Sequence, residues 1–208
     1  MTNILVLNSS VSGEASVSKI LVRDTVERLL EAHPRATVVQ RDLDLIPVPH
    51  LTSSTIAGVR GVATTQAELG ALALSDELIA ELRAADTVVI GAPMYNFSIP
   101  TSLRAWFDHV LRPRVTFSYS DAGPQGLLTG KRVIVIESRG GMYSEGPAKA
   151  IDFQEPYLRF LLSFIGLTDV TFIHAEKLGF GAEAREAALA DARAKIAIAA
   201  SQPLAEAA

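Results

Sequence analysis

The chain has 208 residues, a formal net charge of −4 and 49% hydrophobic residues, and we expect residues 1–208 to form a single domain with a sizeable core. The net charge gives no basic footprint and disfavours nucleic acid as a partner, and the absence of cysteine excludes disulfides, thiolate catalysis and cysteine-ligated metals. The N-terminus has no leader pattern and no apolar run approaches the roughly 20 residues of a membrane span, so we expect a cytoplasmic protein with no membrane partner.

A short apolar strand, residues 4–7, opens the chain and ends in a loop rich in hydroxyl groups. The loop contains Ser10, Ser16 and Ser18, and a helix with apolar residues at helical spacing follows it. Free N–H groups at a helix start, the helix dipole and serine hydroxyls together form a natural anion site. The alternative is a polar loop with an ordinary N-cap serine. Neither G-x-G-x-x-G nor G-K-[ST] is present, which excludes a dinucleotide fingerprint and a Walker loop.

A second strand is predicted over residues 36–40, and an irregular segment rich in proline and glycine follows over residues 43–63. We expect this segment to cross the surface as a lid or as a partner contact, two alternatives that the sequence leaves open. Thr65 and Glu68 form a capping-box pattern that starts a helix through Leu82.

The next buried strand, residues 87–90, opens into a loop between two prolines. Pro93 has no donor N–H, so we expect strand pairing to stop there, and Pro100 can open the following helix. Between them, residues 94–97 read Met-Tyr-Asn-Phe, two aromatic rings around an amide. A strand that leads into such a loop and then a helix is typical of a site for a flat, partly polar ligand, and ordinary packing of the rings is the alternative.

Alternating residues 115–119 predict a short exposed strand or a hairpin arm, which the turn residues 121–124 close. A fourth buried strand, residues 133–136, leads into Ser-Arg-Gly-Gly at 138–141, where glycine lets a ligand approach bare backbone N–H groups. The remaining elements are a helix, a strand and an Ala-rich helix, at residues 154–165, 170–174 and 182 to about 200. We expect the tail, residues 203–208, to fray.

Five apolar strands that alternate with helices predict an α/β fold, with a doubly wound parallel sheet between two helix layers. The carboxyl ends of parallel strands share one edge, so the loops after the first, third and fourth strands should meet there. A flavodoxin-like strand order 2-1-3-4-5 places the switch point between the first and third strands, where flavodoxin itself binds FMN. We therefore expect the three loops to bind one ligand together.

These loops resemble the flavin-binding segments of the FMN-dependent NADH-azoreductase family, part of a wider group of quinone reductases with a flavodoxin-like fold. The resemblance covers nearly the whole chain except residues 43–63 and the C-terminal tail. The segments that carry it most specifically are Ser9-Ser10, Ser16–Ser18, Ala92–Phe97 and Ser138–Gly141.

The resemblance implies three sets of residues around FMN and a further set around the substrate. The phosphate would contact Ser10, Ser16, Val17 and Ser18. The ring and its ribityl chain would contact Pro93, Met94, Tyr95, Asn96 and Phe97 on one side, and Ser138, Arg139, Gly140 and Gly141 on the other. The substrate pocket would include Tyr119, Tyr143 and Phe164.

Family members are homodimers with the flavin at the subunit boundary, and Tyr119 and Phe164 match positions that line the pocket from the partner chain. Many relatives have histidine where this chain has Tyr143. A phenol can donate a hydrogen bond but does not titrate near neutrality, so the role of this position stays open.

The resemblance also implies an enzyme that takes two electrons from NADH or NADPH and passes them to a quinone or an aromatic azo compound. The two substrates would occupy the same place in turn, and no side chain is expected as an essential catalyst because the chemistry occurs on FMN. Two alternatives are a flavodoxin-type electron carrier without its own turnover and a protein that kept the fold without a flavin.

The chain shows no metal-ligand spacing, and we expect its histidines at surface or satisfied polar positions: His33, His50, His109 and His174. We therefore predict no metal site. Trp106 and Phe107 are expected in the core.

Overall fold

The computed structural model describes residues 2–121 and 123–202, so the tail for which we expected fraying lies outside the described residues. The strands are β1 (Asn3–Asn8), β2 (Thr37–Asp42), β3 (Thr87–Pro93), β4 (Phe117–Ser120), β5 (Gly123–Gly126), β6 (Arg132–Ser138) and β7 (Asp169–Ala175). The helices are α1 (Val17–Ala32), α2 (Ile56–Val59), α3 (Gln66–Ala84), α4 (Thr101–Val110), α5 (Glu155–Phe164) and α6 (Ala182–Ser201). Two 3-10 turns, Gly13–Ala15 and Pro147–Ile151, complete the described elements.

Within the described residues, the main sheet has the order β2-β1-β3-β6-β7 and every neighbouring pair is parallel. This is the expected order 2-1-3-4-5, because β4 and β5 pair with each other in a separate antiparallel hairpin. Every residue of β3 and β6 is buried, as expected for central strands covered on both faces. The flavodoxin-like doubly wound fold predicted from the sequence is confirmed.

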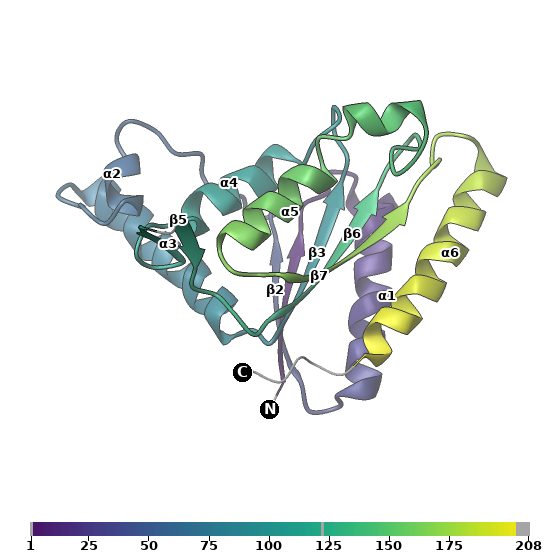
Figure 1. Ribbon diagram of the computed structural model, residues 1–208, viewed down its shortest axis with the longest axis horizontal. Helices are drawn as coiled ribbons and strands as arrows, with labels where there is room; N and C mark the ends of the chain where they lie inside the picture. The colour runs from purple at the N-terminus through teal and green to yellow at the C-terminus, as the bar shows by residue number, and fades with distance from the viewer. Residues whose placement is uncertain (1, 122, 203–208) are drawn as a thin grey trace.

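Helices cover both faces of the sheet and make three layers (Figure 1). Alternate strand residues point to opposite faces, so Val88 packs in the core beneath α3, α4 and α5, whereas its neighbour Val89 packs beneath α1 and α6. Trp106 and Phe107 are both 1% exposed, which confirms their expected place in the core. Full burial of one such Val side chain contributes about 1.5–3 kcal/mol of transfer free energy.

The structure corrects the expected end of β3, which runs through Pro93 and pairs it with Ser138 of β6. The next residue, Met94, donates its N–H to the Ser138 carbonyl at 2.9 Å. Directions alternate along a strand, so the nitrogen of Pro93 faces the other side, where the β1 register ends with Asn8 opposite Gly91. The missing N–H therefore costs no ladder hydrogen bond, and the strand continues.

The other local patterns take the form that the sequence predicts. Thr65 and Glu68 form both hydrogen bonds of the capping box at the start of α3. The hairpin pairs Tyr119 with Pro124. Residues 43–63 form the irregular extension beside α3 at one end of the molecule, with α2 as its short helix (Figure 1). In the described part of the chain, none of the helices combines the length and apolarity that crossing a bilayer requires.

Candidate functional site

The loops after β1, β3 and β6 meet at the carboxyl edge of the sheet and contact one another directly (Figure 1). The Tyr95 hydroxyl accepts the Val11 N–H at 3.1 Å and shares a hydrogen bond with Ser10 Oγ at 3.3 Å. On the other side of this loop, Met94 N–H donates to the Ser138 carbonyl at 2.9 Å. The three loops thus form one continuous edge.

The hydroxyl-rich end of this edge is the start of α1. Ser16 is the N-cap, and its Oγ accepts the Lys19 N–H at 3.2 Å and lies 3.1 Å from Ser18 Oγ. A helix leaves its first N–H groups without intrahelical acceptors, so the amides of Val17 and Ser18 add donors beside these hydroxyls. Ser16 therefore serves as the N-cap that we gave as the alternative, and the same first turn provides the donors that an anion needs.

The aromatic loop is a tight turn with an unusual backbone. Tyr95 and Ser98 exchange both backbone hydrogen bonds, at 3.0 and 3.1 Å, and the two residues between them have positive φ, +48° at Asn96 and +70° at Phe97. Positive φ at a residue other than glycine costs about 1–3 kcal/mol and is concentrated at ligand sites. The Phe97 ring is 45% exposed and meets Tyr143 edge-on at 6.2 Å, so ordinary core packing does not account for it.

The third loop presents a bare backbone. A Cβ on Gly140 would meet no heavy atom within 4 Å, whereas a Cβ on Gly141 would approach the Tyr143 ring to 3.0 Å. The space beside Gly140 is therefore open, and Tyr143 packs against its neighbour. The hydroxyls and free amides at one end of the edge fit the phosphate of FMN. The exposed rings and the open glycine backbone at the other end fit its flat ring.

The Arg139 side chain points away from this open edge and is fully buried. Its guanidinium makes ion pairs with Glu137 at 2.6 Å and with Asp152 and Glu176, both at 3.1 Å. Its Nε donates to Gln154 Oε1 at 3.0 Å. The Arg139 side chain therefore lies beneath the loop, where it can affect a ligand only through the residues it holds in place.

His174 lies next to this network, and its Nε2 is 3.1 Å from Glu137 and 2.9 Å from Glu155. Burial acts to lower the pKa of His174, but its hydrogen bonds to the two carboxylates raise that pKa to about 9. The hydrogen bond from His174 also holds the pKa of Glu155 at about 2, whereas burial raises the pKa of Glu137. These three side chains have the spacing of possible metal ligands, which the separated sequence positions did not reveal, but Arg139 already pairs with Glu137.

Comparison with known proteins decides the family. Residues 2–198 match a family model described as a flavodoxin-like fold. An FMN-dependent NADH:quinone oxidoreductase from Hyphomonas neptunium is 65% identical over 197 residues, which cover 95% of each chain. This chain belongs to the FMN-dependent NADH:quinone oxidoreductase family. A member from Azotobacter vinelandii is 49% identical over 95% of this chain and 98% of its own.

Solved structures agree with this family. An azoreductase from Bacillus anthracis str. Sterne has a TM-score of 0.88 and 30% identity, covering 96% of this chain and 99% of its own. An FMN-dependent NADH-azoreductase from Bacillus anthracis str. Ames Ancestor, solved in complex with FMN, has a TM-score of 0.87 and 26% identity, covering 97% and 98%. The family resemblance inferred from the loop sequences is confirmed.

The expected substrate-pocket residues of this oxidoreductase fall into two places within one chain. Tyr143 lies beside Phe97 at the loop edge. Tyr119 is on the hairpin, where its ring meets Phe117 at 5.6 Å, and Phe117 in turn meets Phe164 at 4.6 Å. The hairpin packs against the end of α5, where Gly126 lies against Gly166, and Figure 1 shows it apart from the three loops. One chain therefore does not bring Tyr119 to the candidate site.

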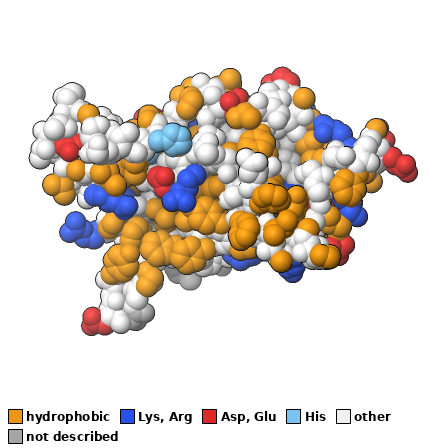
Figure 2. Space-filling model, turned by 90° about the horizontal axis from the view of Figure 1, so that it is seen from above, with side chains coloured by type: hydrophobic (Ala, Val, Ile, Leu, Met, Phe, Trp, Pro, Cys, Tyr) orange, Lys and Arg blue, Asp and Glu red, His pale blue; other side chains and the backbone are white. Residues whose placement is uncertain are grey.

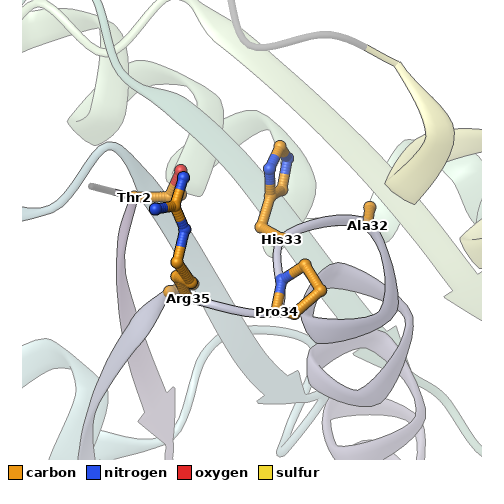
Figure 3. A pocket seen from close by; sticks show the side chains of 6 residues that line it. Thr2, Ala32, His33, Pro34 and Arg35 are labelled. Carbon is orange, nitrogen blue, oxygen red and sulfur yellow. The ribbon is translucent and has the colours of Figure 1, made fainter.

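A hollow of about 370 Å³ lies at the opposite end of the sheet from the candidate site (Figure 3). It lies where α1 ends and β2 begins, and it is lined by Thr2, Ala32, His33, Pro34, Arg35 and Ala36. The length of the strands lies between this hollow and the three loops, so the hollow is not part of the candidate site. The residues that sequence reasoning missed are the partners of Arg139, for which no motif gives a signal: buried Glu137, Asp152 and Gln154, and half-buried Glu176.

Proposed function

We propose that this protein transfers two electrons from NADH or NADPH, through bound FMN, to quinones and to aromatic azo compounds, which it cleaves reductively in a ping-pong reaction. The expectations of an enzyme and of FMN as cofactor agree with the names of its relatives. The observation that carries the proposal is the continuous edge that Tyr95 and Met94 build between the loops after β1, β3 and β6.

In this proposal each end of the edge holds one part of the cofactor. The Ser10, Ser16 and Ser18 hydroxyls and the amides of Val17 and Ser18 hold the phosphate, where the dipole of α1 also favours negative charge. Residues 93–97 and 138–141 border the ring. FMN, when bound, supplies the hydride and electron chemistry. Backbone N–H groups of the ring loops that point toward the ring would favour negative charge on its reduced form.

The substrates would stack where the aromatic side chains are exposed. Phe97 offers a ring face or edge to a flat molecule, and the Tyr143 hydroxyl beside it can donate a hydrogen bond to an acceptor oxygen or nitrogen. No buried acid at the edge is needed, because solvent can protonate the product.

We also propose a homodimer with the site at the subunit boundary. The apolar side chains left exposed around the hairpin and α5 support it, among them Tyr119 at 71%, Phe160 at 61% and Phe153 at 60%. An apolar hollow of about 400 Å³ lies between α4 and α5, lined in part by Phe153 and Tyr157. Figure 2 shows hydrophobic side chains gathered in a broad patch on the face seen from above. The cytoplasmic location expected from the sequence stays a prediction.

Stopped-flow absorbance tests the reaction. We expect NADH or NADPH to bleach the flavin absorbance of the FMN-loaded protein, and a quinone added afterwards to restore it without a ternary complex. A flavin that neither nucleotide reduces would contradict the proposed function. Accumulation of a blue neutral semiquinone on photoreduction, without quinone turnover, would instead favour the electron-carrier alternative.

A further inference from the structure

A chain of two buried hydrogen bonds connects the loop after β6 with the end of β3, directly before the aromatic loop. Arg139 Nε donates to Gln154 Oε1 at 3.0 Å, and Gln154 Nε2 donates to the Ala92 carbonyl at 2.8 Å. Both side chains are fully buried. Arg139 lies within the loop after β6, and Ala92 is the residue before Pro93 in β3. One amide side chain thus links the two sides of the proposed ring site from beneath, where β3 and β6 end side by side.

We propose that Gln154, together with Arg139, is a positioning residue that sets the spacing of the two flavin-ring loops. This inference rests on the proposed function, because it assigns to Gln154 an effect on the FMN that those loops hold. Neither side chain reaches the open edge, so the pair acts through the backbone and not by contact with the ligand.

The segment that carries Gln154 also supports the aromatic turn. Phe153 donates its N–H to the Phe97 carbonyl at 3.1 Å, and its own carbonyl accepts a hydrogen bond from Ser98 Oγ at 3.3 Å. The left-handed backbone at Asn96 and Phe97 is unfavourable by itself and persists only where the surroundings fix it. The Phe153 backbone provides that support at two points, directly before Gln154.

Arg139 extends the same network to the residue beside the ring site. Its partner Glu176 accepts the N–H groups of Tyr143 at 2.8 Å and of Ser144 at 2.9 Å. Its partner Asp152 accepts the Gln154 N–H at 2.9 Å. The guanidinium therefore ties together the backbone near Ala92, the 152–154 segment and the loop that carries Tyr143. Gln154, Asp152 and Glu176 are hydrogen-bonded in this network, whereas Glu137 Oε1 has no hydrogen-bond partner. Hydrogen-bonded buried groups are rigid, and a rigid frame is what keeps backbone donors aimed at a cofactor.

The test uses Gln154→Met, which keeps the length of the side chain but removes both hydrogen bonds. We expect FMN to bind the full-length apoprotein about tenfold more weakly, measured by quenching of flavin fluorescence. We also expect the two-electron midpoint potential of the bound flavin to differ from wild type, a readout that a general loss of stability does not move. Gln66→Met, at an exposed position that starts α3, is the control and should match wild type in both.

Gln154→Glu covers the case in which the methionine variant fails to fold. It keeps an acceptor for Arg139 but turns a carboxylate oxygen toward the Ala92 carbonyl in place of the donor, so we expect weaker FMN binding and again a changed potential. A folded Gln154 variant with wild-type affinity and wild-type potential would overturn this inference alone. A wild-type protein that binds no FMN, or whose FMN is not reduced by NAD(P)H, would overturn the proposed function instead.

Discussion

At the scale of single residues, His174 gives the protein a defined response to pH. The folded protein holds the pKa of His174 near 9, above the ordinary value of about 6.5, so protonation stabilises the fold fully below pH 6.5 and this contribution is lost as pH rises through 9. We expect the free energy of unfolding of wild type to fall by on the order of 2–3 kcal/mol across this interval. Urea unfolding of His174→Gln should lack this slope, and the exposed His50→Gln should retain it.

Sequence could place the hydroxyls but not the buried charges. Ser16 and Ser18 are foreseeable because a helix start dictates where its free amides and capping oxygens lie. The inward direction of Arg139 is not, because its partners lie 2 to 37 residues away and only the finished fold brings them together. His174 was assigned to a surface or satisfied polar position on spacing alone. It is satisfied, but by Glu137 and Glu155 from two other elements.

At the scale of elements, the aromatic turn predicts how its backbone tolerates substitution. Asn96 has a φ of +48°, which Gly adopts freely and a β-branched residue adopts at a cost of about 1–2 kcal/mol. We expect Asn96→Val to lower the free energy of unfolding of the apoprotein by about that amount, with Asn96→Gly close to wild type. Both variants lack the amide, so the difference between them in urea unfolding reports the backbone alone. Equal stabilities would contradict a left-handed residue at this position.

Local sequence patterns predict which helices and strands form more accurately than they predict where each one ends. Buried strands of β-branched residues and the Thr65 capping box are set by side chains within a few residues of each other, and both form as expected. The exception is Pro93, where local chemistry alone predicts a stop. Whether a missing N–H matters depends on which neighbour it faces, and that depends on where β1 ends, at Asn8.

At the scale of the whole molecule, the alternation of strands and helices predicts a parallel sheet, and right-handed crossovers leave few arrangements of it, of which the flavodoxin-like order 2-1-3-4-5 is one. The meeting of the three loops follows from that order and is confirmed by the contacts of Tyr95 and Met94. How chains associate does not follow from it. Only the tertiary structure shows that Tyr119 lies on a hairpin apart from the loops. For this reason the proposed function needs the partner chain to bring Tyr119 to the site.

The proposed dimer predicts that a charge on α5 disrupts both assembly and turnover. Phe160 is 61% exposed, and a lysine there would place a charge within the expected apolar contact, so we expect Phe160→Lys to sediment as a monomer. Its quinone turnover should fall by about a hundredfold, because the partner's Tyr119 and Phe164 would no longer orient the substrate. Ile198→Lys is the matched control, since Ile198 is 64% exposed on α6, which covers the opposite face of the sheet. It should stay dimeric and active, whereas a wild-type monomer with bound FMN and full activity in analytical ultracentrifugation would contradict the shared site.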